Sequence, residues 1–540
     1  MRQSYDYIIV GAGSAGCVIA SRLTEDKDVS VLVLEAGGSD RHWLLRLPIA
    51  WPMAAVKRET NWNYQTEPEP QLGGRQIPLP RGKVLGGSSA INGMGYKRGH
   101  PRDYDLWRQL GNEGWSYADV LPYFKRSENS WRGDDAYHST RGPLSVRDGG
   151  ARERLLYDPL AQAVVKAGYK IVHDIGGAET EGLFTTELTV DKFGRRHSTA
   201  RAFLYPAMSR PNLTVISKAL TTRVVVENGR AVGVEYVNDG VTQIARAERE
   251  IVLSAGAYNS PQILMLSGIG PADELRQHGI GPVLDLPGVG RGLVEHASAP
   301  VVAAAKGKTF LRELRYDRGA FWFLQWALTG TGPYSSNGNT AGLFVRSDPA
   351  LERPDLQLTF NTVSLYDKPW WPWQAKAQRY AFSCIVCLIN PRSRGRLWLR
   401  SANPAEPPRI WLNLFGEQAD LDLAVHGIRR VREIYATAPQ SDLIRAEVLP
   451  GPKAQSDAEL AEHVRRTAST MQHPASSCRM GIDDMAVVDP ELKVRGIDRL
   501  RVADASIFPS IPGGNINAPT IMVGEKCADM LRGRRLPPEP

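Results

Sequence analysis

A glycine-rich loop near the start of the chain constrains the fold more than any other feature of the sequence. An apolar run at residues 5–10 leads directly into GAGSAG at residues 11–16, and residues 17–23 then follow a helical pattern. A second apolar run at residues 29–34 ends at Glu35, roughly 20 residues beyond the loop, as dinucleotide-binding units require. This order of strand, G-x-G-x-x-G loop, helix, strand and acid predicts a Rossmann-like unit that binds a dinucleotide.

Each glycine of the loop has a separate physical task in such a unit. Gly11 allows the tight turn, Gly13 lets a pyrophosphate approach the backbone, and Gly16 permits close packing of the helix on the sheet. The helix N-terminus then presents free N–H groups to the phosphates. Glu35 is expected to accept hydrogen bonds from both ribose hydroxyls and to repel a 2′-phosphate. The loop alone fits NAD and FAD equally well.

The composition is that of an ordinary globular protein with a large core. Among 540 residues, 42% are hydrophobic and 23% are charged, and 51 glycines with 37 prolines indicate many turns and long loops. No apolar run approaches the ~20 residues of a membrane span, and residues 1–4 show no charged-then-apolar pattern, so we expect no signal peptide. Five cysteines are too few for a disulfide framework. These features predict a cytoplasmic protein, with peripheral association at the inner membrane face as the alternative.

The net charge of +8 does not by itself indicate a nucleic-acid partner. Basic residues are scattered among acids, and only RGRR at residues 532–535 forms a cluster. That cluster ends an expected helix, where positive charge suits the macrodipole. We therefore predict no nucleic-acid partner, and a net positive field that mildly attracts anionic cofactors.

Turn signals and apolar periods divide the rest of the chain into further elements. RGKVLGGSSAINGM at residues 81–94 is expected to form a second backbone-donor loop that opens a helix. The other expected elements are a β-meander at 214–237, a buried strand at 250–255, a helix opened by Ser260 and Pro261, a helix at 418–436, a strand at 499–507, and a helix from Pro519 to about residue 531. This order implies a nucleotide-binding domain of separated segments with a second domain inserted.

Four segments together resemble one enzyme family. They are GAGSAG with Glu35, RGKVLGGSSAIN at 81–92, SAGAYNSPQILMLSGIGP at 254–271, and ADASIFPSIPGGNINAPTIMVGEK at 503–526. In this order they are similar to the glucose–methanol–choline (GMC) family of FAD oxidoreductases, over essentially the whole chain. The similarity is greatest to bacterial alcohol and choline dehydrogenase-type members. The resemblance implies FAD rather than NAD.

The resemblance implies an α/β fold with two domains. A Rossmann-like FAD-binding domain is expected to combine residues 1–160, 195–300 and 490–540. A substrate-binding α+β domain, with an antiparallel sheet and flanking helices, is expected to combine residues 161–194 and 301–489. A second strand–Gly–Gly–helix unit supports this division, because it lets the C-terminus return to a flavin buried between the domains.

The resemblance also implies which residues hold the FAD. These are Gly11, Gly13, Ser14, Ala15, Gly16, Glu35, Ala36, Arg81, Gly86, Gly87, Ser88, Asn92, Gly93, Met94, Val224, Ala255, Gly256, Asp504, Ala505, Asn515, Asn517 and Thr520. In one family variant a His of the second glycine block bonds covalently to FAD, and Ile91 stands at the matching position here. A hydrocarbon side chain cannot form that bond, so we predict non-covalent FAD. The stretch 288–296 departs from the family's Asn-Leu-Gln-Asp-His ending at Gly292 and Val294, and it is assigned no role.

The catalytic residues implied by the resemblance are His473 and Asn517. Pro474 holds His473 in extended geometry, from which the ring can project into a cavity. The ordinary pKa of histidine, about 6.5, suits proton exchange with an alcohol. Asn517 stands where many family members have a second His, and it can hydrogen-bond the alcohol oxygen but cannot act as a base. Asn515 and Asn517 are expected just before the last helix, whose N-terminus would stabilise negative charge on the reduced flavin.

These residues predict FAD-dependent oxidation of a primary alcohol to the aldehyde. His473 accepts the hydroxyl proton, Asn517 orients the oxygen, and the hydride passes to flavin N5. A quinone, a cytochrome or O2 must then reoxidise the flavin. An O2-using alcohol oxidase and a flavin-containing cyanohydrin lyase are the alternatives. Aliphatic, aromatic, polyether and choline-like alcohols all stay open as substrates.

The remaining conspicuous residues have simpler interpretations. Cys384 and Cys387 lie in an apolar run without a second pair, so we expect core residues rather than a metal site. Two aromatic clusters comprise Trp370, Trp371 and Trp373, and Phe321, Trp322 and Trp326. These clusters suit a substrate channel, a membrane surface or ordinary packing. The histidines show no metal-ligand spacing, and no metal is predicted.

Overall fold

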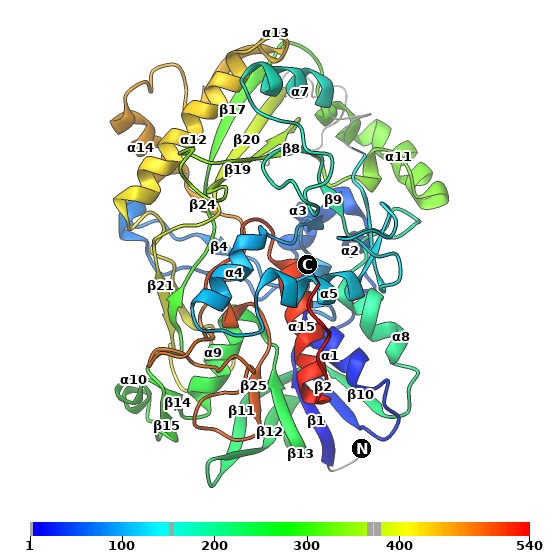
Figure 1. The fold of residues 1–540 in the computed structure, drawn as a ribbon, viewed down its shortest axis with the longest axis vertical. Coiled ribbons are helices and arrows are strands. Elements are labelled where there is room, and N and C mark those ends of the chain that lie inside the picture. Colours follow the sequence, from blue (N-terminus) through cyan, green and yellow to red (C-terminus); the bar gives the residue numbers. More distant parts are fainter. Residues whose placement is uncertain (1–3, 151–155, 364–370, 372–379, 540) are drawn as a thin grey trace.

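The computed structural model describes residues 4–150, 156–363, 371 and 380–539, and two large sheets organise it (Figure 1). The strands of the first sheet, in spatial order, are β10 (Leu213–Ser217), β2 (Val31–Glu35), β1 (Ser4–Val10), β13 (Val241–Leu253), β12 (Arg230–Asn238) and β11 (Ala219–Glu227), with β25 (Leu500–Val502) beside β13. The pairs from β10 to β13 and the β13–β25 pair are parallel. Strands β11, β12 and β13 form an antiparallel meander.

The central parallel strands β1 and β2 are buried over most or all of their length. Ile8, Ile9 and Val10 in β1 are nearly inaccessible to solvent, and every residue of β2 is buried. Such near-continuous apolar runs are typical of parallel strands that are covered on both faces. Helix α1 (Gly16–Leu23) packs against β1 and β2, and helix α15 (Asn517–Leu531) lies beside α1 although it comes from the other end of the chain (Figure 1).

Two glycines allow these helices to approach so closely. A Cβ atom on Gly16 would lie 1.9 Å from the Gly11 carbonyl oxygen, so α1 can start directly against the loop after β1 only with glycine there. A Cβ atom on Gly524 would lie 2.9 Å from the Ala15 carbonyl oxygen, which brings α15 against the start of α1. The C-terminal helix is thereby held beside the first glycine loop.

The second large sheet is antiparallel throughout (Figure 1). Its strands, in spatial order, are β23 (Ile444–Leu449), β17 (Ala297–Ala305), β20 (Ala381–Leu388), β19 (Leu356–Asn361), β18 (Asn339–Val345) and β8 (Gly182–Phe184), with β24 (Ser469–Thr470) beside β17. Helix α12 (Gln418–Ala436), observed with the predicted bounds, packs on this sheet. Gly427 permits the contact, since its Cβ would lie 2.4 Å from Val386.

The second sheet has an apolar face under α12 and a face that lines a cavity. Along β20, Cys384 and Val386 are in the core, whereas Ser383 and Ile385 line the cavity. Successive side chains on a strand point to opposite faces, so the alternation decides which residues meet the cavity. Cys384 and Cys387 are buried free thiols. Because they lie three residues apart in one strand, their side chains point to opposite faces of the sheet. They are core residues, as the sequence predicts.

Smaller elements connect the two sheets. The longer of the remaining helices are α4 (Pro101–Gln109), α5 (Tyr117–Ser127), α7 (Tyr157–Lys166), α9 (Gly256–Leu266), α11 (Tyr316–Thr329) and α14 (Asp457–Thr467). The minor sheets contain β16 (Arg291–Leu293), β21 (Gly395–Trp398) and β22 (Arg409–Trp411), and β5 (Gly95–Tyr96), β9 (Glu187–Leu188), β7 (Leu144–Asp148) and β6 (Glu128–Ser130). Strand β5 is important for the site because Lys97 follows it directly.

Two predicted helix starts differ from those observed. The second glycine loop opens only a 3₁₀ turn at Gly87–Ala90, because the chain around it has left-handed backbone angles, with φ of 90° at Gly86. Helix α9 begins at Gly256 and holds Pro261 in its interior, rather than beginning at Ser260. A proline cannot donate to the carbonyl one turn earlier. That carbonyl, of Ala257, instead accepts a hydrogen bond from the Ser477 hydroxyl.

The C-terminal elements also differ from the prediction. The strand expected at 499–507 is limited to Leu500–Val502, after which Asp504 begins a 3₁₀ turn. Helix α15 starts at Asn517 rather than Pro519. Asn517 is therefore the first residue of the helix and does not precede it.

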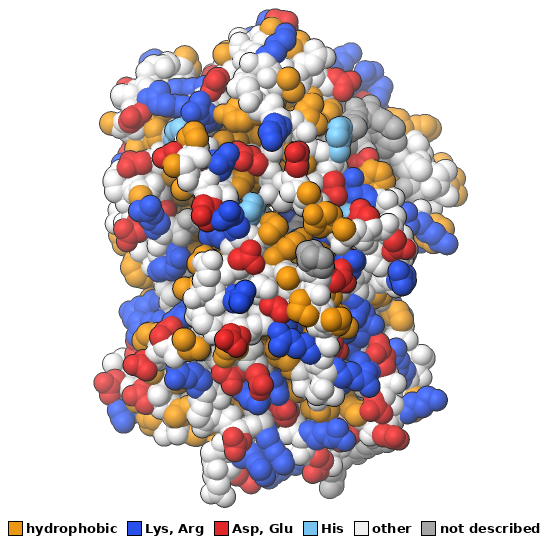
Figure 2. Space-filling view, in the orientation of Figure 1, with side chains coloured by type: hydrophobic (Ala, Val, Ile, Leu, Met, Phe, Trp, Pro, Cys, Tyr) orange, Lys and Arg blue, Asp and Glu red, His pale blue; other side chains and the backbone are white. Residues whose placement is uncertain are grey.

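The outer surface carries charges of both signs and some exposed apolar side chains. On the face in Figure 2, lysine and arginine side chains are interspersed with acidic ones. Within the described residues, no helix is long and apolar enough to cross a bilayer. On α11, Trp326 is buried whereas Phe321 and Leu328 are exposed, and Trp371 contacts the ring of Tyr316. Trp370 and Trp373 lie outside the described residues.

We expect Gly16→Ala to destabilise the fold by about 1–3 kcal/mol, the usual cost of overpacking a fitted core. The added methyl group would collide with the Gly11 carbonyl oxygen, so the midpoint of thermal unfolding should fall. Gly281→Ala is the matched control, because no heavy atom lies within 4 Å of a Cβ at that position. Equal unfolding midpoints for the two variants would contradict the close contact.

Candidate active site

A cavity of about 570 Å³ is lined by residues of both large sheets. The loop after β1 and the end of β2 contribute to its wall, and strands β17, β18, β19 and β20 contribute from the second sheet. The segments that contain His473 and Asn515 complete the wall. Residues that are hundreds of positions apart in the chain therefore line the same cavity.

Glu35 lies on the cavity wall at the end of β2 and is already hydrogen-bonded to the backbone. Its Oε2 accepts from the Ala12 N–H at 2.9 Å, and its Oε1 accepts from the Gly37 N–H at 2.8 Å. Burial raises the pKa of Glu35 to about 7, although both backbone hydrogen bonds oppose the shift. Each carboxylate oxygen keeps a further lone pair that can accept from a ribose hydroxyl. The position and the acceptors fit the ribose of a dinucleotide.

The neighbouring part of the wall is a cradle of glycines. Gly87 packs on the first loop so closely that a Cβ would lie 2.8 Å from Gly13 Cα. Gly256 also lines the cavity, and no heavy atom lies within 4 Å of a Cβ placed there. Side chains at Gly13 and Gly256 would thus occupy cavity space, at the loop before α1 and at the start of α9 respectively. The residues present therefore fit a bound FAD, with backbone N–H groups available to its phosphates.

Most of the predicted cofactor residues line this cavity. They are Gly11, Gly13, Ser14, Ala15, Glu35, Ala36, Arg81, Gly87, Ser88, Asn92, Gly93, Met94, Ala255, Gly256, Asp504, Ala505, Asn515, Asn517 and Thr520. Gly16 instead packs against the Gly11 backbone, and Gly86 packs against side chains including Ser198 and Ala200 while its N–H donates to the Ala12 carbonyl at 2.7 Å. Val224 is buried in β11, where its N–H donates to Ser267 Oγ, and the structure does not place it on the cavity. The lining residues of that strand are Ala219, Leu220 and Thr221.

His473 lines the cavity and is held through its own backbone. Its N–H donates to Glu295 Oε1 at 2.6 Å. Burial lowers the pKa of His473 well below its ordinary value, and positive neighbours including Arg81 and Lys97 act in the same direction. The pKa therefore lies below, not near, the value of about 6.5 expected from an average histidine. The imidazole is neutral at pH 7.

A row of hydrogen bonds fixes the tautomer of His473. His296 Nε2 lies 3.1 Å from the Ile389 carbonyl oxygen, which can only accept, so this nitrogen carries a proton. Burial lowers the pKa of His296 to about 3, so its ring is neutral and has its lone pair on Nδ1. His473 Nδ1 lies 2.9 Å from that atom and must donate to it. The lone pair of His473 is therefore on Nε2.

The opposite end of this row of hydrogen bonds, at Lys97, imposes the same order of donors and acceptors. Lys97 Nζ donates to Asn515 Oδ1 at 2.7 Å, which orients the amide so that Nδ2 faces His473. Asn515 Nδ2 lies 3.1 Å from His473 Nε2 and donates to it. Because the Ile389 carbonyl cannot donate and the Lys97 ammonium cannot accept, neutral His473 presents an acceptor at Nε2.

The polar neighbour of His473 is Asn515 rather than Asn517. Asn517 Oδ1 accepts a hydrogen bond from Ser14 Oγ at 2.7 Å, which ties the start of α15 to the first glycine loop. Both asparagines line the cavity, but only Asn515 contacts the His473 ring. The expected partner of His473, Asn517, thus contacts Ser14 in the structure, and Asn515 occupies the position beside the ring.

Three residues around His473 are missed by sequence reasoning. His296 and Glu295 belong to the loop that carries no assigned role because Gly292 and Val294 depart from the family pattern. The sequence feature that could have identified them is a pair of ionisable residues directly before the apolar strand β17. Lys97 has no local signal, because a single lysine after a short strand is normally exposed.

Glu295 supports the two histidines from behind the cavity wall. Its Oε1 accepts from the N–H groups of His296 and His473, at 3.0 and 2.6 Å. Burial raises the pKa of Glu295 to about 8, although both backbone bonds and the charge of Arg81 oppose this. The group is therefore an uncharged support at pH 7.

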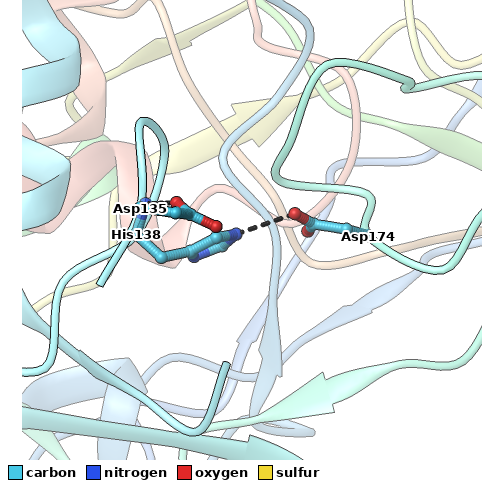
Figure 3. Close-up of side chains that lie close together, drawn as sticks. All are labelled: Asp135, His138 and Asp174. Atoms are coloured by element: carbon cyan, nitrogen blue, oxygen red, sulfur yellow. Dashed lines mark hydrogen bonds and ion pairs between the residues drawn. The ribbon is translucent and has the colours of Figure 1, made fainter. Parts of the chain in front are cut away.

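A separate cluster of Asp135, His138 and Asp174 has the spacing of a metal site (Figure 3). His138 Nε2 lies 3.0 Å from Asp174, and its Nδ1 lies 2.9 Å from Glu128. Burial lowers the pKa of His138, but the hydrogen bonds to these two carboxylates outweigh it and raise the pKa to about 9. In the part of the chain that the structure describes, both ring nitrogens of His138 thus face carboxylates, of Glu128 and Asp174, and Asp135 accepts from the His138 backbone N–H.

The fold and the cavity together define a class of protein. A glycine loop with an acid at the end of the next strand forms a dinucleotide site. A histidine and an asparagine border the same cavity, under an antiparallel sheet. This combination of a cofactor site with proton-transfer groups is that of a flavin-dependent oxidoreductase.

The chain belongs to the GMC oxidoreductase family, whose models match residues 5–298 and 391–524. It is 43% identical over 533 residues to an oxygen-dependent choline dehydrogenase of Brucella canis, with 98% of this chain and 96% of the relative covered. A protein of the same name from Rhizobium rhizogenes is 42% identical over 540 residues, with the same coverage. This chain is thus an FAD-dependent enzyme that acts on a CH–OH group.

Solved structures share the fold over the whole chain. Pyridoxine 4-oxidase from Mesorbium loti is 28% identical, with a TM-score of 0.88, and covers 99% of this chain and 100% of its own. A variant of formate oxidase from Aspergillus oryzae is 27% identical, with a TM-score of 0.91, and covers 98% of each chain. The parallel cofactor sheet and the antiparallel second sheet are therefore those of the family fold.

We expect Glu35→Ala to weaken FAD binding by about 1–3 kcal/mol, the cost of losing charge-assisted hydrogen bonds. Two backbone N–H groups would also lose their acceptor. The measurement is the FAD dissociation constant of the refilled apoprotein. Glu248→Ala, at an exposed glutamate, is the control. Unchanged FAD affinity in Glu35→Ala would refute the ribose assignment.

Proposed function

We propose that the enzyme oxidises a primary alcohol to the aldehyde, with His473 as the base. The observation that carries the proposal is the fixed tautomer, which leaves the Nε2 lone pair of a neutral imidazole next to an amide donor on the cavity wall. FAD, when bound, supplies the acceptor for the hydride. A neutral imidazole at this position is suited to take the hydroxyl proton.

The hydroxyl of the alcohol would insert between His473 Nε2 and Asn515 Nδ2. There its O–H donates to the imidazole lone pair, and its oxygen accepts from the amide. The positive charge that forms on His473 is held in place, because Nδ1 still donates to His296. Asn515 positions the oxygen without titrating, and Lys97 keeps that amide from turning over. The role first expected of Asn517 therefore moves to Asn515.

Three further expectations belong to the proposal. Ile91 is buried on the cavity wall, and its hydrocarbon side chain supports non-covalent FAD. The two large sheets support two domains that divide near residues 160, 195, 300 and 490. The five cysteines are all buried free thiols, which suits a reducing compartment such as the cytoplasm.

The relatives suggest which substrates and acceptors to test first. By their names, the two bacterial relatives oxidise choline with oxygen, and the solved relatives are oxidases of pyridoxine and formate. Choline-like and other primary alcohols, with O2, a quinone or a cytochrome as acceptor, therefore form the first panel. Anaerobic bleaching of the flavin by an alcohol supports a dehydrogenase or oxidase, whereas a cyanohydrin lyase would show none.

We expect His473→Ala to keep FAD but to slow anaerobic flavin reduction by roughly 10²–10⁴-fold, the usual value of a positioned base. Asn515→Ala should be impaired less, because an amide orients the oxygen but takes no proton. Rapid mixing of each holoenzyme with the best alcohol of the panel measures the rates. If His473→Ala stays within about threefold of the parent, the base lies elsewhere.

The pH profile of the parent enzyme gives a second prediction. A base whose pKa is lowered is in its active, neutral form at every pH above that value. The rate of flavin reduction should therefore be flat at neutral and mildly acid pH and should fall only well below pH ~6.5. His473→Ala should lack that acid limb. A limb centred near pH ~7 that persists in His473→Ala would contradict the assignment.

We expect His296 to act through the tautomer of His473. His296→Gln keeps an acceptor for His473 Nδ1–H and a donor for the Ile389 carbonyl, whereas His296→Leu removes both. The leucine variant should reduce its flavin roughly 10–100-fold more slowly, with an altered pH profile, as when an orienting partner is lost. The glutamine variant should retain most of the parental rate. Equal rates and profiles for the two variants would show that His296 only fills space.

A further inference from the structure

A buried lysine borders the proposed alcohol site. Lys97 is 5% exposed and lines the cavity, and its ammonium donates to Asn515 Oδ1 at 2.7 Å. The same ammonium lies 5.4 Å from the centre of the Phe184 ring. Burial lowers the pKa of Lys97 to about 8, so the group is still mainly charged at pH 7. An alcohol held by His473 and Asn515 therefore lies close to a fixed positive charge.

The described part of the cavity lining contains two carboxylates, and neither is available to a cation near His473. Glu35 is bound by backbone N–H groups in the dinucleotide region. Asp504 accepts from the Gly256 N–H at 2.9 Å and from the Ser506 N–H at 2.8 Å. Glu295 is hydrogen-bonded to backbone N–H groups and is not part of the lining.

The wall that the second sheet contributes is uncharged and mixes polar with apolar side chains. The polar ones include Ser298, Asn339, Thr359, Asn361 and Ser383, with Asn337 just before β18, and the apolar ones include Pro300, Val302 and Ile385. Asn337 is fixed in place, since its Nδ2 donates to the Gly93 carbonyl at 2.7 Å and its Oδ1 accepts from the Asn339 N–H at 3.1 Å. Amides and hydroxyls of this kind bond to neutral polar groups without a charge to compensate.

Aromatic rings, the other usual partner of a quaternary ammonium, are few on the described lining. They belong to Trp51, Trp62 and Tyr258. Lys83 already lies 4.6 Å from the centre of the Trp62 ring, and the Arg81 guanidinium lies 5.9 Å from that of Tyr258. Trp51 is then a single ring, whereas recognition of quaternary ammonium ions uses a cage of several.

We infer that this site takes uncharged primary alcohols and discriminates against choline-like cations. The inference rests on the proposed function, because it places the reacting hydroxyl at His473 and Asn515. In choline only two carbons separate the hydroxyl from the trimethylammonium group, so the cation would share the cavity with Lys97. Like charges repel strongly where water is excluded, and an unpaired cation also loses its hydration. An uncharged alcohol avoids both costs.

The test compares choline with 3,3-dimethylbutan-1-ol, which has the same shape but a carbon in place of the charged nitrogen. Apparent dissociation constants come from the concentration dependence of flavin reduction in the holoenzyme. A compound that does not reduce the flavin is measured as a competitor of an alcohol that does. We expect the neutral compound to bind at least tenfold more tightly. Equal or tighter binding of choline overturns the inference.

Lys97→Met tests whether the preference for the neutral compound comes from the charge of Lys97 or from a general preference of the cavity for apolar compounds. In this variant the ratio of the two dissociation constants should fall by at least fivefold, whereas Lys493→Met, at an exposed lysine paired with Glu491, should leave it unchanged. Lys97→Arg keeps the charge and should keep the ratio. If Lys97→Met fails to hold FAD, Lys97→Gln replaces it. A ratio that does not change when the charge is removed overturns the role of Lys97.

Failure of the proposed function would be distinguishable from failure of this inference. If no alcohol of the panel bleaches the flavin, the proposed function fails. The two compounds can still be ranked, because binding beside the flavin perturbs its absorbance without turnover. Preference for the neutral compound would then support charge selection alone, and preference for choline would refute it.

Discussion

The proposed alcohol site depends on one row of hydrogen bonds, which runs from the Ile389 carbonyl through His296, His473 and Asn515 to Lys97. Ile389 follows β20, His296 precedes β17, and His473 follows β24. Asn515 precedes α15, and Lys97 follows β5. Three members thus lie at the ends of strands of the second large sheet, and the other two come from the start of α15 and from the minor sheet of β5. The row therefore joins the second sheet to two elements outside it. Since a carbonyl stands at one end and an ammonium at the other, the donors and acceptors between them have a single consistent order.

Backbone contacts without side chains hold the supporting segments in place. The approaches at Gly16 and Gly524 leave no space for a Cβ atom, so α1 and α15 lie against the first loop at a fixed distance. The hydrogen bond from Ser14 to Asn517 then joins the start of α15 to that loop. Because Asn515 lies just before α15, the position of the amide beside His473 follows from this packing.

The dinucleotide region is predictable from the sequence because its determinants are local. The loop that starts at Gly11 and the acid at Glu35 belong to one strand–helix–strand unit, and their spacing alone places them together. The alcohol site has no such unit. Asn515 and Asn517 are two positions apart, and only the conformation of the turn before α15 decides which of them faces His473. The interior Pro261 is unpredictable for the same reason, because its compensating partner lies far along the chain.

The buried charge of Lys97 has two consequences that cannot be separated. The ammonium holds Asn515 Oδ1, so the amide offers its N–H to His473 Nε2. Without a donor at this position the amide could turn its oxygen towards His473 Nε2, and the row would have to reverse. Reversal would leave the bare nitrogen of His296 facing the Ile389 carbonyl, two acceptors with no proton between them. On the proposed function, the residue that orients His473 is therefore also the residue that makes the cavity positive, and the proposed direction of proton transfer and the proposed charge preference have a common physical origin.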